Sequence, residues 1–233
     1  MATDYWPRSL LILALDTATD RGSLALMEED RLLGEYLLAA PGSFLQHLLP
    51  GLETLLQDTG RRLEDVGAIA VSQGPGNFTG LRLGLATAKG LAWSLRVPLV
   101  AVPTLEVLAA QCALQPRPVA VIIDAKRREV YLGRFLGAEA EPRALEPPVR
   151  LPLAELPGRL TPPLLLTGPA LDTYEDFLED FLRDKLHPDI RLAPPEARHP
   201  RAATLARLAR QRLQAGQTVS PSQLVPLYLR PAL

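Results

Sequence analysis

A carboxylate and two hydroxyls follow the first apolar run of the chain. Asp16 ends the run Leu10–Leu15, and Thr17 and Thr19 come directly after it. Carboxylate and hydroxyl oxygens at the end of a strand can hold a hydrated Mg²⁺. Asp16 can equally cap a turn inside a hairpin, and the residues alone support both interpretations.

A glycine-rich segment offers a second set of groups for anion chemistry. Residues 72–80 read SQGPGNFTG and follow the apolar run Ala68–Val71, so we predict a strand, a loop and a helix in that order. Glycines let backbone amides approach a ligand closely, and a helix N-terminus carries partial positive charge. The candidate nucleotide or anion site consists of Asp16, Thr17, Thr19, Gly74 and Gly76.

Small residues recur every four positions along the helix that follows this loop. A glycine inside a helix costs about 1 kcal/mol relative to alanine, so close packing against another helix or chain must offset the cost. We therefore predict that this helix forms an interface with a partner. The predicted interface residues are Gly80, Leu81, Gly84, Leu85, Ala88 and Ala92. On this hypothesis Gly84→Leu or Ala88→Glu weakens association and leaves the monomer folded.

Three consecutive basic residues mark a second dense constellation, in residues 124–131, which read DAKRREVY. Asp124 closes an apolar strand, as Asp16 does in the first half. Lys126, Arg127 and Arg128 fall at a turn, where they are candidates for contact with an RNA backbone or a partner protein. The alternative is that Asp124 and Glu129 pair with these basic residues across the hairpin.

Other chemistries fit the chain less well. A two-metal nuclease could use Asp16 and Glu53, but the strand Ala68–Ser72 lacks the third carboxylate. The histidines, at positions 47, 187 and 199, form no HxxxH or HExxH pair, and no GxSxG turn is present. Cys112 has no local base. We predict no catalytic residue and no metal site.

The elements that must position these groups are clear in the first half of the chain. Its pattern runs strand, strand, strand, helix, strand, helix, strand, which is typical of a ribonuclease-H-like or actin-like α/β fold. The second half repeats the order more weakly, with a proline-rich stretch over residues 142–163. We predict two βββαβα-type halves, the second degenerate. The predicted boundaries are 1–8 for an N-terminal extension, 9–110 for the first half and 111–233 for a shortened second half.

Composition sets limits on partners and location. The formal net charge of −1 gives no global field that would recruit nucleic acid or an anionic membrane. A single cysteine fits a reducing cytoplasm, and no apolar run reaches membrane-spanning length. We expect a cytoplasmic protein with no membrane partner.

Several motifs in register resemble one family. Residues 13–19, 74–84 with 88–92, 103–105 and 124–131 are together similar to the TsaB (YeaZ) family, and residues 228–230 resemble its tail. The resemblance spans most of residues 10–135. It implies an actin-like (ASKHA) fold and a non-catalytic partner of TsaD in the bacterial machinery for tRNA threonylcarbamoyladenosine.

The same resemblance implies partners and a mode of action. TsaE would join the pair, TsaC would make the threonylcarbamoyl-adenylate donor, and ATP and a metal ion would be used through these partners. The chain would bind no cofactor of its own. It would meet tRNAs that read ANN codons through the complex, and its small-residue helix would pair with TsaD or with a second copy of itself.

The chain departs from the catalytic relatives of that family at two places. The start of the first helix, Ser43–His47, lacks their pair of metal-binding histidines, and the second half offers only Leu166–Ala170 as a counterpart of the second phosphate loop. The site around Asp16 is therefore predicted to be a remnant. An ATP-dependent kinase or hydrolase of the actin-like superfamily is the alternative, and it requires Asp16 to be essential.

Overall fold

The computed structural model describes residues 9–38, 44–112, 116–136, 141–178 and 189–229 of the 233-residue chain. The predicted extension over residues 1–8 lies outside the described residues. The chain forms two compact units: residues 1–103 with 200–226, and residues 104–199 with 227–233. We call them unit 1 and unit 2 and describe each by itself.

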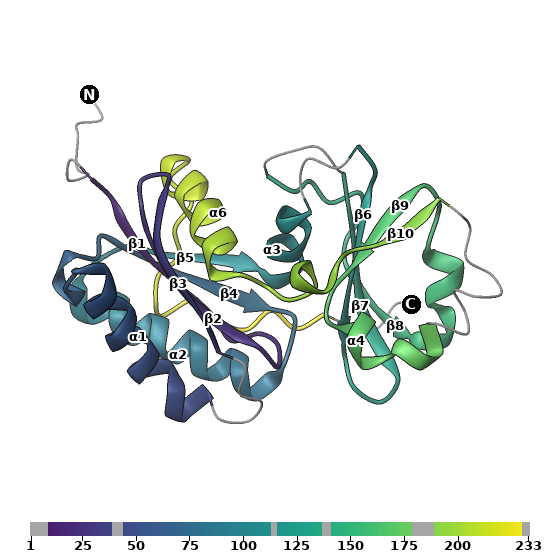
Figure 1. Ribbon diagram of the computed structural model, residues 1–233, viewed down its shortest axis with the longest axis horizontal. Coiled ribbons are helices and arrows are strands. Elements are labelled where there is room, and N and C mark those ends of the chain that lie inside the picture. The colour runs from purple at the N-terminus through teal and green to yellow at the C-terminus, as the bar shows by residue number, and fades with distance from the viewer. Residues whose placement is uncertain (1–8, 39–43, 113–115, 137–140, 179–188, 230–233) are drawn as a thin grey trace. The chain divides into compact units, whose positions relative to one another are not determined.

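Unit 1 is a five-stranded sheet in the order β3-β2-β1-β4-β5, with helices on both faces (Figure 1). The first three strands are antiparallel neighbours, whereas β4 and β5 run parallel to β1. The strands are β1 (Leu11–Asp16), β2 (Gly22–Glu28), β3 (Arg31–Leu38), β4 (Ala68–Gly74) and β5 (Leu99–Pro103), and the helices are α1 (Phe44–Thr59), α2 (Phe78–Leu95) and α6 (Ala202–Gln214), with a short 3-10 turn, η1 (Leu63–Asp65).

Side-chain alternation along β1 explains why both faces of this sheet are covered. Leu11, Leu13 and Leu15 pack into one core with apolar residues of α1 and α2. The intervening Ile12 and Ala14 are also fully buried, and they face α6, which packs on β1 and β2. A continuous apolar strand of this kind is what a sheet with two covered faces requires.

Unit 2 has a second five-stranded sheet, in the order β10-β9-β6-β7-β8. Val119, Val121 and Ile123 pack with α3, and Ala120 and Ile122 pack with the segments after β8 and β9. The elements are α3 (Thr104–Gln111), β6 (Val119–Asp124), β7 (Glu129–Phe135), β8 (Val149–Pro152), the 3-10 segment η2 (Leu153–Arg159), β9 (Leu164–Thr167), α4 (Ala170–Thr173), β10 (Ile190–Leu192) and η3 (Pro195–Ala197).

The two sheets share one topology. In each, the first strand is antiparallel to the second and parallel to the fourth, and the fifth lies beside the fourth. The repeat confirms the prediction of an actin-like α/β fold with two related halves. The third strand of the second half, β8, is shortened to four residues, whereas its counterpart β3 has eight. The sequence did not predict β8, because it lies within the proline-rich stretch.

The boundaries of the units differ from the predicted halves of 9–110 and 111–233. The helix after β5, α3, covers the sheet of unit 2, and the last helix, α6, packs on the sheet of unit 1. Residues 104–110, predicted in the first half, therefore belong to unit 2, and residues 200–226, predicted in the second half, belong to unit 1. A cut at one point of the sequence therefore cannot separate the units.

Arginines fix α6 to unit 1. Arg201 pairs with Glu35, Arg210 with Asp30 and Glu29, and Arg212 Nη1 donates to the Ala101 carbonyl at 2.8 Å. These three arginines therefore attach α6 to the sheet of unit 1. Among the described residues, no helix combines the length and the apolar character needed to cross a membrane.

Candidate functional site

Asp16 lies at the end of β1 and is fully buried. Its Oδ1 accepts the Ala18 N–H at 3.1 Å, and its Oδ2 accepts the Ser72 hydroxyl of β4. Burial raises the pKa of Asp16 from 3.8 to about 6, and the bonds from Ser72 and Ala18 oppose that rise. Both carboxylate oxygens are therefore used inside the protein, and neither is presented to a ligand.

Thr17 is in contact with two of the three glycines of α2, Gly80 and Gly84. Its hydroxyl donates to the Gly80 carbonyl at 2.7 Å. A Cβ added to Gly80 would lie 2.1 Å from the Thr17 carbonyl oxygen, and one added to Gly84 would lie 2.2 Å from Thr17 Oγ1. Real side chains do not reach such distances, so the glycines are required by the protein's own first loop.

The same approach occurs in the glycine-rich loop before α2. The Asn77 amide donates to the Ala18 carbonyl at 2.7 Å, and a Cβ added to Gly76 would lie 2.0 Å from that oxygen. Gly74 has a φ of +110°, which favours glycine. Thr19 donates its hydroxyl to the Arg21 carbonyl at 2.9 Å. The structure thus brings Thr17 and Ala18 against the glycine-rich segment, where their backbone atoms fill the cradle. Of the other predicted site residues, Asp16 bonds to Ser72, Thr19 to Arg21, and Gly74 pairs with Pro103 of β5.

A phosphate group does not fit this arrangement. The N-terminus of α2 is capped by the Asn77 side chain, which accepts from the Gly80 amide at 3.0 Å. Thr17, Thr19 and Asp16 are all buried, with their polar atoms engaged by the chain. No step of a nucleotide reaction can be derived from these groups.

The interface predicted on the small-residue face of α2 needs correction. Gly80, Leu81, Gly84, Leu85, Ala88 and Ala92 are all buried within unit 1. The side chains of Leu85, Ala88 and Ala92 belong to the core beneath the sheet, and Gly80 and Gly84 contact Thr17. The close partner that offsets the glycines is therefore intramolecular, and Gly84→Leu or Ala88→Glu would disturb folding.

The opposite side of α2 is exposed. We define its outer face as Phe78, Arg82, Ala86, Gly90 and Trp93. Trp93 is 78% exposed and Phe78 is 52% exposed, which is unusual for large aromatic side chains. The Arg82 guanidinium lies 3.9 Å from the centre of the Phe78 ring, and a Cβ at Gly90 would meet nothing within 4 Å. Sequence periodicity alone did not single out this face, because its apolar residues are few and widely spaced.

The predicted basic turn lies between β6 and β7 in unit 2. Lys126, Arg127 and Arg128 have φ values of 63°, 55° and 59°, so three successive non-glycine residues are left-handed. Each such residue costs about 1–2 kcal/mol. The Leu153 amide donates to the Arg128 carbonyl at 2.8 Å and the Glu129 amide to the Lys126 carbonyl at 3.0 Å, which fixes the turn.

The acidic residues beside this turn neutralise only part of its charge. Asp124 accepts from the Lys126 amide, from Lys126 Nζ and from the Tyr174 hydroxyl, each at 2.7 Å. Burial raises the pKa of Asp124, but these bonds outweigh it and the pKa lies below its ordinary value. Glu129 pairs with Arg150 instead of the turn. Cross-hairpin pairing is thus confirmed for Asp124 and wrong for Glu129.

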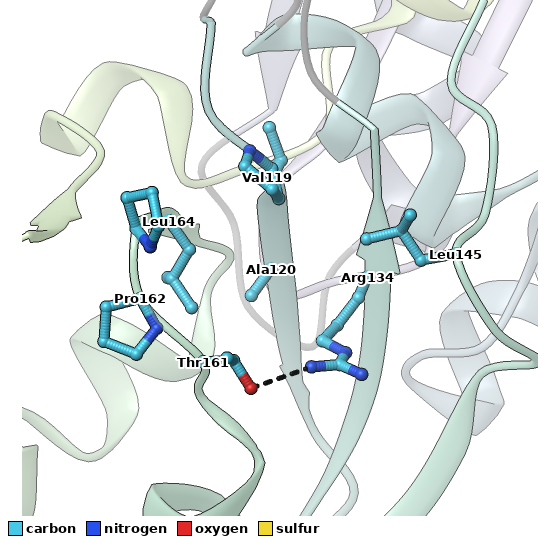
Figure 2. A pocket seen from close by; sticks show the side chains of 9 residues that line it. Val119, Ala120, Arg134, Leu145, Thr161, Pro162 and Leu164 are labelled. Atoms are coloured by element: carbon cyan, nitrogen blue, oxygen red, sulfur yellow. Dashed lines mark hydrogen bonds between the residues drawn. The ribbon is translucent and has the colours of Figure 1, made fainter.

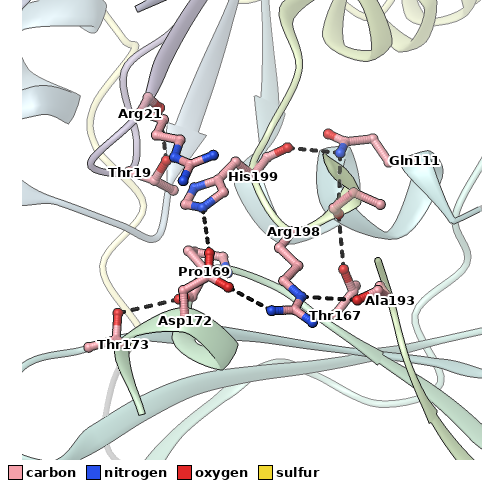
Figure 3. A network of polar contacts seen from close by, with 11 residues as sticks. Thr19, Arg21, Gln111, Thr167, Pro169, Asp172, Thr173, Ala193, Arg198 and His199 are labelled. Carbon is pink, nitrogen blue, oxygen red and sulfur yellow. Dashed lines mark hydrogen bonds and ion pairs between the residues drawn. The ribbon is translucent and has the colours of Figure 1, made fainter. Parts of the chain in front are cut away.

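A polar network in unit 2 joins segments that are far apart in sequence (Figure 3). Asp172 Oδ1 accepts from Arg198 Nη1 at 2.8 Å, and Asp172 Oδ2 lies 2.9 Å from His199 Nε2. The Gln111 side chain donates to the His199 carbonyl at 2.8 Å. These contacts hold the segment after β10 against α3 and α4. The network stabilises the fold of unit 2. The sequence did not predict it, because its members are far apart in the chain and form no local motif.

Unit 2 also contains a hollow of about 430 Å³ with a mainly apolar lining (Figure 2). Its one charged group, Arg134, is bound by both carboxylate oxygens of Glu146, at 2.8 and 2.9 Å. The lining residues are Pro118, Val119, Ala120, Arg134, Leu145, Thr161, Pro162, Pro163 and Leu164. With its charge already paired, the hollow lacks a group that would define a ligand.

The nuclease hypothesis finds no supporting arrangement. Asp16 is fully buried whereas Glu53 is exposed on α1. Among the described residues, no group of three histidine, cysteine, aspartate or glutamate side chains could hold a metal ion. Cys112 is buried in unit 2, where burial raises the pKa of its thiol, so it lacks the character of a nucleophile.

The duplicated sheet topology and the filled cradle define the class of protein: an actin-like (ASKHA) α/β chain whose first phosphate loop is closed. At the level of fold alone, the activator of 2-hydroxyisocaproyl-CoA dehydratase from Clostridium difficile matches with a TM-score of 0.51 and 11% identity, over 90% of this chain and 97% of that one. A family model described as "TsaD: tRNA N6-adenosine threonylcarbamoyltransferase" matches residues 39–150.

Closer relatives narrow the class to one family. The "tRNA threonylcarbamoyladenosine biosynthesis protein TsaB" of Bacillus subtilis is 31% identical over 224 residues, which cover 95% of this chain and 94% of the relative. The solved structure of YeaZ from Pseudomonas aeruginosa matches with a TM-score of 0.79 and 32% identity, over 94% of this chain and 100% of that one. The chain belongs to the TsaB (YeaZ) family.

The contact between Thr17 and Gly84 predicts a strong coupling between two substitutions. Gly84→Ala places a Cβ against Thr17 Oγ1 and should destabilise the fold by about 2 kcal/mol or more. In a Thr17→Ala background the nearest remaining atom would be 3.5 Å away, an ordinary contact, so the cost of Gly84→Ala should largely disappear. Urea denaturation of the four proteins of the cycle measures the coupling.

Two other glycines of α2 serve as controls for that cycle. Gly80→Ala meets the Thr17 carbonyl oxygen, so Thr17→Ala should not rescue it. Gly90→Ala has open space and should stabilise the helix by about 0.5–1 kcal/mol. Equal costs of Gly84→Ala in both backgrounds would contradict the packing account.

Burial of Asp16 predicts a pH-dependent stability. Because the folded pKa is raised, the contribution of Asp16 to stability is complete below about pH 4 and is lost as the pH rises through about 6. Asp16→Asn cannot ionise, so its stability relative to wild type should increase by about 2–3 kcal/mol over that interval. Denaturant titrations from acid to neutral pH check this, and parallel curves for the two proteins would refute it. Ser72→Ala removes a hydrogen bond that lowers the pKa of Asp16, so the fall in stability with pH should extend to higher pH in this variant.

Proposed function

We propose that this chain is a non-catalytic scaffold subunit that binds TsaD and supports transfer of threonylcarbamoyl to the adenosine next to the anticodon of ANN-decoding tRNAs. Membership of the TsaB family supports the pathway, since relatives are named as tRNA threonylcarbamoyladenosine biosynthesis proteins. The single observation that carries the scaffold role is the cradle filled by Thr17 and Ala18.

The filled cradle argues against a catalytic role for the chain alone. An actin-like kinase or hydrolase needs its first loop open to phosphate and its strand-end carboxylate available to a metal ion. Here Asp16 is enclosed and bonded to Ser72 and Ala18. ATP and the metal ion are accordingly assigned to the partners, TsaD, TsaE and the donor-forming TsaC. The chain itself is assigned no cofactor, and the complex is placed in the cytoplasm with its tRNA.

The outer face of α2 is the surface we assign to TsaD. Exposed aromatic side chains are typical anchors of protein interfaces, and this face carries Phe78 and Trp93. Between them lie Ala86 and Gly90, whose small size lets a partner helix approach closely. The buried side of the same helix is fixed to the sheet of unit 1, so the face is presented on a rigid support. When TsaD is absent, a second copy of the chain could use the same face.

Acidic substitutions on this face should abolish binding and spare the fold. In the double variant Ala86→Glu, Trp93→Glu we expect affinity for TsaD to fall at least about tenfold, because an aromatic anchor is lost and charge is added. Titration calorimetry with purified TsaD measures binding, and thermal unfolding checks that the melting temperature stays close to that of wild type.

A matched control separates the face from the chemistry of the change. Leu37 of β3 is 57% exposed and stands beside Ser23, whose side chain contacts the start of α6, so it lies on the other side of the sheet. Leu37→Glu should bind TsaD normally. Wild-type binding by the α2 double variant would refute the assigned surface. Failure of the wild-type chain to bind TsaD would refute the proposed function.

A further inference from the structure

The turn Lys126–Arg128 keeps arginines where the backbone favours glycine. All three residues are left-handed, and hydrogen bonds from Leu153 and Glu129 hold them there. A turn that needed only to reverse the chain would be more stable with glycine or asparagine at these positions. Basic residues that keep an unfavourable left-handed backbone indicate that their side chains have a function.

The charges of the turn are not equivalent. Lys126 is bound by Asp124, and the nearest other acid, Glu129, is bound by Arg150. Neither Arg127 nor Arg128 forms an ion pair or side-chain hydrogen bond with any residue that the structure describes. Both are exposed. The tip of the hairpin therefore presents two adjacent guanidinium groups, although the whole chain carries a net charge of −1.

Two adjacent guanidinium groups on a fixed backbone suit a ligand with repeated phosphates. Guanidinium donates two parallel hydrogen bonds to phosphate oxygens and cannot be deprotonated in a protein. The fixed turn means that little backbone order is lost on binding. Because the chain as a whole is weakly acidic, its attraction for an anion depends on local groups of positive charge such as this tip.

We propose that Arg127 and Arg128 bind the phosphate backbone of the tRNA substrate, so that this subunit contributes a direct RNA contact. The identity of the RNA rests on the proposed function, whereas the site itself rests on the turn. The contact reads backbone charge and carries no base sequence, since guanidinium–phosphate bonds do not distinguish bases.

The test compares two charge-matched double variants of the full chain. Arg127→Gln, Arg128→Gln removes the proposed contact. Arg31→Gln, Arg96→Gln removes the same charge from two exposed arginines of unit 1. The probe is a fluorescent, unmodified transcript of a tRNA that reads an ANN codon. Fluorescence anisotropy at several salt concentrations is measured with the chain alone and with TsaD present, and TsaD binding is measured separately.

The proposal predicts a specific loss for the turn variant. Its RNA affinity should fall about tenfold or more. The negative slope of log affinity against log salt should become shallower by about 1.4–1.8, as expected for the loss of two phosphate contacts. The unit 1 variant should retain the wild-type slope, and both should bind TsaD. Arg127→Gly, Arg128→Gly should lose RNA binding equally and keep or raise the melting temperature, because glycine relieves the left-handed backbone.

Each other outcome overturns the inference in a distinct way. Equal RNA affinity of the two Gln variants, with TsaD binding intact, refutes the RNA contact and leaves the proposed function standing. Loss of TsaD binding by the turn variant makes the turn a protein contact. If wild-type chain and TsaD do not associate, the proposed function fails, and the comparison with the chain alone still decides the RNA contact.

Discussion

The backbone of Thr17 and Ala18 and the hydroxyl of Thr17 pack against Gly76 in the loop before α2 and against Gly80 and Gly84 in its first turns. Added Cβ atoms at Gly76, Gly80 and Gly84 would lie 2.0–2.2 Å from atoms of these two residues. This contact joins the end of β1 to the start of α2, two segments about sixty residues apart in sequence. It sets the depth at which α2 lies on the sheet, and the burial of Asp16 and the choice of outer face on α2 follow from it.

Because α2 packs closely against the loop after β1, the face with its small residues is buried, and the outer face with Phe78 and Trp93 is exposed. A glycine-rich loop at a strand end usually marks a ligand site, since glycine admits a ligand to the backbone. Here glycine admits the protein's own chain. The same residue pattern can thus close a phosphate site that it would elsewhere open. The proposed function therefore looks to the exposed surfaces of the units and not to this loop.

The strands other than β8, the α2 loop and the class of fold could be predicted from the sequence because they depend on local apolar periodicity and on glycine placement. The predicted run 10–15 matches β1 within one residue, and the predicted order of strands and helices in the first half is the order observed up to β5. The sequence could not predict whether a close-packing face contacts the protein's own core or another chain. The stripe from Gly80 to Ala92 was correctly interpreted as a close-packing surface, but one sequence does not state whether the close partner is internal. The exchange of α3 and α6 between units and the pairing of Glu129 with Arg150 are likewise long-range choices.

The proposed function requires that the loop before α2 is closed to nucleotide and that the chain acts through its surfaces. The most direct measurement is a calorimetric titration of the purified chain with Mg-ATP, repeated after addition of TsaD. The account predicts no heat of binding for the chain alone, and binding only in the mixture, through the partner. Binding of Mg-ATP by the isolated chain that is lost in Asp16→Asn would contradict it.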